Sequence, residues 1–178
     1  MGMTPSGGLM MGTRKGDLDR GVILYLMREE ALSLPELAAV IDRESGLLGV
    51  CGLSADMKTL LENAVSHAGA ALAIEMFCRT ACKQIAAMAA SLNGLDALVF
   101  TGGIGERAAS IRKRICEGLS FLGLELQNEA NRVHRSVIHA PSSRVVIRIV
   151  PAQEELILAR RTRTLLAGRT ADYTSRRT

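Results

Sequence analysis

A run of glycines follows an apolar stretch in the second half of the chain. Residues 98–100 (LVF) lead into 101–105 (TGGIG), and a helical pattern opens at Glu106. Glycines at a strand-to-helix junction let the backbone approach a ligand closely, and the free amides of the new helix favour an anion such as a phosphate. The pattern is typical of a nucleotide site, and an ordinary strand-to-helix turn is the alternative.

An acidic pair stands at a second junction of the same kind. The strand expected over 144–150 (RVVIRIV) ends at Pro151, and Gln153, Glu154 and Glu155 open the next helix. Ligands of open α/β sheets bind outside the carboxyl ends of the strands, so the glycines at 102–105 and these acids can share one crevice. A phosphate with a divalent cation would bind to both the glycines and the acids. The alternative is that the two glutamates only stabilise the N-terminus of their helix.

Two further segments carry charge at positions suited to ligand binding. Arg14 lies on the glycine-flanked loop MGTR, where its planar guanidinium could clamp a carboxylate or phosphate or simply face solvent. Asp56 and Lys58 fall in the first turn of a helix expected over 55–65 and capped by Ser54. The helix dipole accounts for Asp56 but not for Lys58.

The remaining pattern predicts a helix-rich α/β chain with few strands. Expected helices are one capped by Asp17 and ending near residue 31, one from Ser33 to about residue 43 with a capping box, a long one over 67–92 and one over 105–119. Expected strands are 96–101, 144–150 and a short one at 137–140, while 45–52 is a glycine-punctuated apolar segment and 1–16 a loop.

Composition points to one soluble domain. The chain has 178 residues, of which 48% are hydrophobic and 22% charged. Its least polar stretch, 68–92, carries charges at helical spacing, which excludes a membrane span, and no signal peptide is evident, so we expect a cytoplasmic protein. The four cysteines have neither disulfide nor zinc spacing, and we expect reduced, mostly buried thiols.

The net charge of +4 comes from the C-terminal segment. Residues 160–178 hold six arginines and one acid. No aromatic residues or nucleic-acid motifs accompany these arginines, so we expect no nucleic-acid binding. The sequence predicts a domain over 1–168 and a basic, disordered tail over 169–178.

Four segments, in this order and spacing, resemble the C-terminal half of acetate kinase and its short-chain acyl kinase relatives. They are MGMTPSGGLMMGTRKGDLD (1–19), GLLGVCGLSADMKTL (46–60), ALVFTGGIGERAASIRKRI (97–115) and VPAQEELILAR (150–160). The resemblance leaves out only the arginine-rich tail. It implies part of a ribonuclease-H-like C-terminal domain of the superfamily that includes sugar kinases, actin and heat-shock ATPases.

The resemblance also implies roles for individual residues. Arg14 would engage the transferring phosphoryl group or the acyl carboxylate, and Glu154 would associate with Mg²⁺. The residues implied for the nucleotide are Asp56, Met57 and Lys58 in one segment and Gly103, Ile104, Gly105, Glu106 and Arg107 in the other. The chain departs from the family where Lys58 replaces an arginine and where Arg107 and Gln153 replace asparagines.

The activity that the resemblance implies is reversible, Mg²⁺-dependent phosphoryl transfer from ATP to acetate, giving acetyl phosphate and ADP. It also implies a homodimer through this half, for which the alanine-rich helix over 67–92 offers a surface. The family's N-terminal domain and its catalytic residues have no counterpart here, so we expect a truncated enzyme that does not turn over alone. A nucleotide-binding or dimerisation module without activity, and a propionate or butyrate kinase fragment, are the alternatives.

Overall fold

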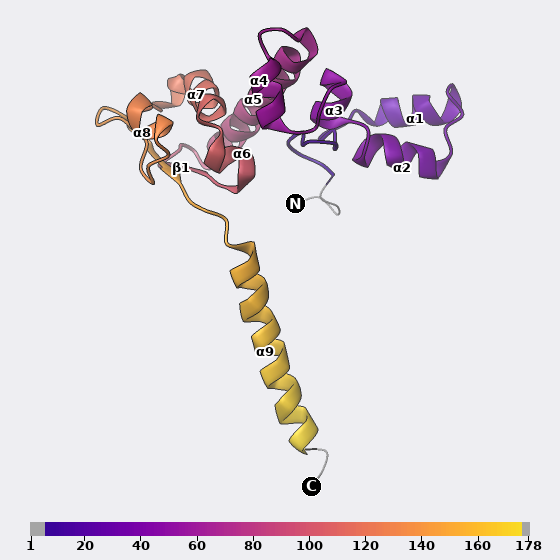
Figure 1. Cartoon of the computed structure of the whole chain (residues 1–178), viewed down its shortest axis with the longest axis vertical. Coiled ribbons are helices and arrows are strands. Elements are labelled where there is room, and N and C mark those ends of the chain that lie inside the picture. The colour runs from indigo at the N-terminus through magenta and orange to yellow at the C-terminus, as the bar shows by residue number, and fades with distance from the viewer. Residues whose placement is uncertain (1–5, 176–178) are drawn as a thin grey trace.

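The computed structural model describes the backbone of residues 6–175 and the side chains of residues 6–166; the first five residues of the expected N-terminal loop lie outside the described part. Helices and a small sheet form a body, and one long C-terminal helix projects from it (Figure 1). Among the described residues no helix is both long and apolar enough to cross a membrane.

The sheet has two parallel strands, β1 (Ala97–Phe100) and β2 (Val146–Ile149), with Ala97 opposite Val146 and Phe100 opposite Ile149. Both strands were predicted, and each is shorter by one to two residues at either end. The strand expected over 137–140 is wrong: Val137 and His139 form only isolated bridges, to Arg148 and Leu126. A side chain every second residue faces the core, which buries Ile147 and Ile149.

The long helix α5 (Ala68–Ser91) confirms the prediction over 67–92, and the His67 side chain caps it by accepting from the Ala70 amide. Its buried alanines, Ala70, Ala73 and Ala81, let other helices approach closely. It packs against α3 (Gly46–Cys51), α4 (Met57–Asn63) and α7 (Ala109–Gly118). The segment expected as an apolar stretch over 45–52 is therefore the helix α3.

Two predicted helix caps are wrong. Asp19, not Asp17, caps α1 (Arg20–Arg28), because the Asp17 carboxylate instead accepts from the Gly8 amide at 2.6 Å and from Gln84 at 2.9 Å. Asp56, not Ser54, caps α4, since the Ser54 hydroxyl accepts from the Asp56 amide. Helix α2 (Leu34–Asp42) has the expected Ser33 capping box.

The helix expected over 105–119 is split into two. Helix α6 (Gly102–Arg107) ends where Ala108 takes a non-helical conformation, φ −100° and ψ 84°, and α7 starts at the next residue. The break frees the last carbonyls of α6 to accept from the Arg112 side chain of α7. The 3₁₀ helix η1 (Ser120–Leu122) and α8 (Asn128–Arg132) complete the crossover to β2.

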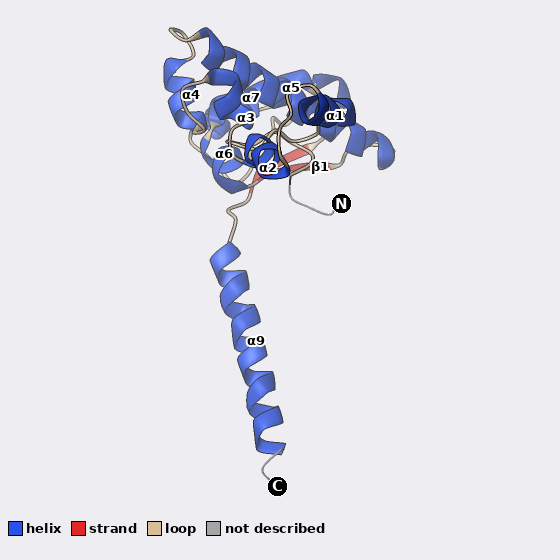
Figure 2. Ribbon diagram, turned by 90° about the vertical axis from the view of Figure 1, so that its right-hand side faces the viewer, coloured by secondary structure: helices blue, strands red, loops and turns tan. Residues whose placement is uncertain are grey.

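The C-terminal helix α9 (Glu154–Ser175) projects from the body after an irregular linker (Figure 2). Its start matches the prediction. The helix runs through Ser175, so it includes most of the segment expected as a basic tail over 169–178, whose last three residues lie outside the described part. Leucines in its first half, such as Leu156 and Leu158, are exposed.

All four cysteines are free, as predicted. Cys51, Cys78 and Cys116 are buried and Cys82 is partly so. Burial raises the pKa of Cys78 to about 11 and that of Cys116 to about 12. Such thiols remain protonated and unreactive at neutral pH.

Candidate functional site

The carboxyl ends of β1 and β2 lie side by side, as expected for parallel neighbours. The Val150 amide donates to the Phe100 carbonyl at 2.9 Å, and past this bond the chain turns into α6 on one side and into the linker to α9 on the other. A pocket of about 550 Å³ opens between the two junctions. It is lined by Gly102, Gly103, Glu106, Arg107 and residues 152–156. The structure thus brings the glycine loop and the acidic pair into one crevice.

A second pocket, of about 350 Å³, lies on the other side of the same loop. Its lining residues are Asp56, Met57, Lys58, Leu61, Gly103, Ile104, Arg107 and Ala108. Gly103 and Arg107 line both pockets, so we treat the two together as one central groove. The structure therefore gathers the two segments expected at a nucleotide, which are 45 residues apart in the chain, around this groove.

The glycine loop leaves room for a ligand at its backbone. A Cβ placed on Gly102 or Gly103 would meet nothing within 4 Å, and Gly102 has φ +72°, which favours glycine. Gly105 differs, because a Cβ there would lie 3.4 Å from the Phe100 backbone. Gly102 and Gly103 therefore border open space, whereas Gly105 serves close packing of α6 on β1.

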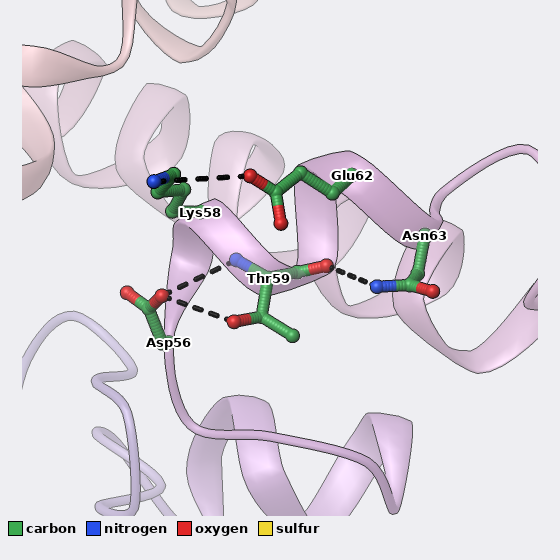
Figure 3. Close-up of polar contacts among 5 residues, drawn as sticks. All are labelled: Asp56, Lys58, Thr59, Glu62 and Asn63. Atoms are coloured by element: carbon green, nitrogen blue, oxygen red, sulfur yellow. Dashed lines mark hydrogen bonds and ion pairs between the residues drawn. The ribbon is translucent and has the colours of Figure 1, made fainter.

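Asp56 and Lys58, at the start of α4, line the groove. Figure 3 shows the polar contacts of their side chains. The Asp56 carboxylate accepts from the Thr59 amide at 3.2 Å and from the Thr59 hydroxyl at 3.1 Å. The bond from the amide is the main cause that holds the pKa of Asp56 below its usual range. Lys58 extends into solvent and pairs with Glu62 one turn later at 3.9 Å. Asp56 is thus committed to capping α4, whereas the Lys58 pair is weak and exposed.

Glu106 joins the two junctions of the groove. Its Oε1 accepts from the Gly102 amide at 2.9 Å and from the Ala152 amide at 2.8 Å. The first bond stays within α6, and the second crosses to the segment that precedes Glu154. The carboxylate therefore has a structural role whatever else it contacts.

A buried arginine holds the other end of α6. Arg112 has no exposed surface, and its Nη1 donates to the Gly105 and Glu106 carbonyls at 2.8 and 2.9 Å. Nε donates to Asn131 Oδ1 at 2.7 Å and Nη2 to the Asn131 carbonyl at 2.8 Å. Burial lowers the pKa of Arg112. Sequence reasoning missed this residue, because an arginine beside Ile111 on an amphipathic helix gives no sign that it is buried.

Arg14 lies on a turn that is fixed to the body. The carbonyls of Met11, Gly12 and Thr13 accept from amides at the start of α3, and the Met11 amide donates to the Arg14 carbonyl. Met11 and Gly12 line an apolar pocket of about 470 Å³ whose other wall includes residues 98–105. Arg14 lines neither this pocket nor the central groove. The structure thus places its turn near the glycine loop but does not bring its side chain to the groove.

Metal-binding clusters are absent from the described part of the chain, where no three His, Cys, Asp or Glu side chains converge. Glu154 and Glu155 stand exposed at the start of α9 and line the larger pocket of the groove. One or two carboxylates at an open site suit Mg²⁺ that arrives with phosphate and water ligands better than a resident ion held by protein alone.

The chain is similar to known proteins over most of its length. Residues 1–160 match the model of the acetokinase family. The acetate kinase of Treponema denticola is 44% identical over 170 residues, covering 93% of this chain and 43% of that protein. The acetate kinase of Rhodopseudomonas palustris strain CGA009 is 46% identical over 170 residues, covering 94% of this chain and 42% of that protein.

Solved structures agree. The structure of Porphyromonas gingivalis acetate kinase matches with a TM-score of 0.85 and 39% identity, over 93% of this chain and 43% of that one. A propionate kinase from Francisella tularensis matches with a TM-score of 0.84 and 39% identity, over 89% of this chain and 41% of that one. The chain therefore spans less than half the length of the relatives that it matches.

Proposed function

The chain belongs to the acetokinase family, and from that premise we propose that it carries the nucleotide-binding part of a short-chain acyl kinase. The observation that carries the proposal is the central groove, where Asp56–Lys58 and Gly103–Arg107 meet with Glu154 at one end. The reaction of the complete enzyme would be reversible transfer of the ATP γ-phosphoryl group to acetate, giving acetyl phosphate and ADP.

The groove suits a nucleotide in shape and chemistry. Gly102 and Gly103 leave their backbone open, so a ligand can lie against it. Lys58 and Arg107 give the pocket on the α4 side two cations, and Arg107 in place of the family's asparagine leaves the backbone contribution of the loop intact. We expect the base and ribose on the α4 side and the phosphates toward residues 152–156.

Mg²⁺ would be held by Glu154 on the phosphate side of the groove. When bound, it neutralises charge on the phosphoryl oxygens as the group is transferred. Arg14 lies outside the groove, so its expected role on the phosphoryl group or the acyl carboxylate would require its side chain to turn toward the glycine loop in the complete enzyme. Holding the reactants in line accounts for most of the rate acceleration in this reaction class. Residues from both pockets of the central groove are therefore needed.

The 178-residue chain alone should not catalyse the transfer, since it spans about 43% of its curated relatives. Acetate-dependent ATP turnover by the purified chain would refute this. Acetate, propionate and butyrate are all candidate acyl substrates. One additional methylene in an apolar pocket changes the binding free energy by only about 1–3 kcal/mol.

Titration of ADP with Mg²⁺ into the purified chain by calorimetry tests the proposal. We expect binding that Gly103→Ala weakens roughly ten-fold or more, because the added methyl points into open groove and displaces only ligand. Gly7→Ala is the matched control, since a Cβ there makes one ordinary 3.5 Å contact with Asp17, away from the groove. No heat of binding from a folded wild-type chain would contradict the proposal, as would equal affinity of the Gly103→Ala variant.

A dimerisation module is the second candidate, favoured by apolar side chains on the outer face of α5. Leu72 and Met76, one turn apart, are 53% and 41% exposed there. A face of this kind can bury itself against a second copy. Sedimentation of the wild-type chain and of Leu72→Glu separates the outcomes: a dimer that the substitution dissociates supports the module, and a monomeric wild type excludes it.

A further inference from the structure

The two junctions that border the groove are tied by one carboxylate. The last backbone bond between the strands joins Val150 to Phe100, and beyond it one segment enters α6 while the other continues toward α9. Glu106 supplies the next link, because its Oε1 accepts from both the Gly102 and the Ala152 amides. The bond to Ala152 spans 46 residues of sequence, whereas the bond to Gly102 closes a single helical turn.

We propose that Glu106 is a positioning residue that sets the separation between the glycine loop and Glu154. The inference rests on the proposed function, in which phosphates lie on the loop and Mg²⁺ lies on Glu154. Glu106 acts through the backbone at residue 152, two residues before Glu154, and need not contact nucleotide or metal itself.

The need for such a tie follows from the surroundings of Glu154. Residues 150–153 have no regular secondary structure, and α9 projects from the body rather than packing on it (Figure 1). The placement of Glu154 therefore depends on how the linker is fixed. A linker free to sample several conformations would have to be ordered when metal binds, at a cost of about 1–2 kcal/mol per residue.

The other end of the tie is rigid. The Glu106 carbonyl accepts from the buried Arg112 at 2.9 Å, and so does the Gly105 carbonyl at 2.8 Å. Arg112 in turn is held by Asn131 on α8. The Glu106 side chain therefore starts from a fixed backbone, and its length decides where residue 152 lies.

Length and charge of the side chain can be separated by substitution. Glu106→Gln keeps the reach and an oxygen that accepts both amides but loses the charge. Glu106→Asp keeps the charge but is one methylene too short to reach the Ala152 amide from the same backbone. A positioning role predicts that the glutamine variant behaves as wild type and the aspartate variant as Glu106→Ala; a charge role, such as direct metal binding, predicts the reverse.

Two measurements on the 178-residue chain decide the matter. Amide hydrogen exchange should be roughly ten-fold or more faster at residues 152–155 in the aspartate and alanine variants, and within about three-fold of wild type in the glutamine variant. Titration of ADP should show that the gain in affinity on adding Mg²⁺ shrinks in the same two variants, while affinity for metal-free ADP changes less. Glu117→Ala, which removes an exposed carboxylate paired with Lys113 on α7, is the matched control and should alter neither readout.

The outcomes separate this inference from the proposed function. If the wild-type chain binds no ADP, the proposed function fails, and the exchange rates alone still decide whether Glu106 orders the linker. Wild-type exchange at residues 152–155 in the alanine variant would overturn the inference. So would a glutamine variant that matches alanine while the aspartate variant matches wild type.

Discussion

Replacement of Arg112 by leucine should destabilise the chain strongly. The guanidinium is completely buried and donates to the Gly105, Glu106 and Asn131 carbonyls and to Asn131 Oδ1. A leucine of similar bulk removes this donor from all four acceptors, although the Asn131 carbonyl keeps the His134 amide at 3.2 Å and the Glu106 carbonyl keeps His134 Nδ1 at 3.0 Å. The Asn131 side chain keeps only the bond from its Nδ2 to the Ala109 carbonyl at 2.9 Å.

The size of the decrease in stability depends on which acceptors are left with no hydrogen-bond donor. Asn131 is only 3% exposed, so its Oδ1 stays dry, and an unpaired buried acceptor costs about 1–3 kcal/mol. The Asn131 carbonyl loses less, because it still accepts from the His134 amide at 3.2 Å. The Glu106 carbonyl keeps its contact with His134 Nδ1 at 3.0 Å, and Gly105 is only partly buried, so these two carbonyls add less. Removing a buried charge offsets part of the loss. We expect a net decrease of about 3 kcal/mol in the free energy of unfolding, against a total of about 5–15 kcal/mol for a domain.

Urea unfolding followed by circular dichroism measures this decrease. Arg112→Lys should lose less, about 1–2 kcal/mol, because an ammonium keeps the charge and three donors but not the planar geometry. Arg114→Leu is the matched control on the exposed face of α7 and should stay within about 0.5 kcal/mol of wild type. The reasoning is refuted if Arg112→Leu unfolds within about 1 kcal/mol of wild type at an unchanged denaturant slope.

Three further predictions concern the core, the thiols and a helix cap. Leu60→Ala should lower the free energy of unfolding by about 3 kcal/mol, because Leu60 has no exposed surface. Cys78 and Cys116 should resist a thiol reagent at pH 8 until the chain unfolds, since burial raises their pKa to about 11 and about 12. The bonds from the Ser33 hydroxyl and amide hold the pKa of Glu36 below its usual range. The charged Glu36 carboxylate therefore stabilises α2 at neutral pH, and this stabilisation is lost as the carboxylate is protonated between about pH 5 and pH 3.

Each of these predictions has a control or a contradicting result. Met88→Ala, at an exposed position of α5, should change stability little in the same urea titration. Labelling of Cys78 in the folded chain as fast as in urea would contradict its burial. Ser33→Ala should flatten the acid limb of the stability profile between about pH 5 and 3, and an unchanged limb would show that the cap contributes nothing there.

Local signals in the sequence were sufficient for most of the secondary structure. The capping box at Ser33, the alanine-rich run of α5 and the apolar runs of the two strands each encode their element through contacts a few residues apart. The four segments that resemble the acetokinase family were also sufficient to identify the family, because each is a short motif and all four keep the family's order and spacing. These features are short-range, so the linear chain displays them directly.

Choices between equivalent local partners required the tertiary structure. Asp17 and Asp19 are both good helix caps, and the loop that returns to Gly8 decides that Asp17 is occupied elsewhere. The break between α6 and α7 at Ala108 has no proline or glycine beside it, so the sequence does not predict it. It forms because Arg112 can satisfy the freed carbonyls, and that depends on where α8 brings Asn131.

Some features of the candidate site were predicted from the sequence, and others required the tertiary structure. The sequence alone predicted which segments form the candidate site: the glycine loop, Asp56–Lys58 and Glu154 each stand at a recognisable junction. Only the tertiary structure decided that these segments meet around one groove, that the Arg14 side chain is not brought to it, and that Glu106 ties its two edges. The physical reason is that such contacts join residues some 45 positions apart, and parallel strand pairing, which no local pattern specifies, sets their distance.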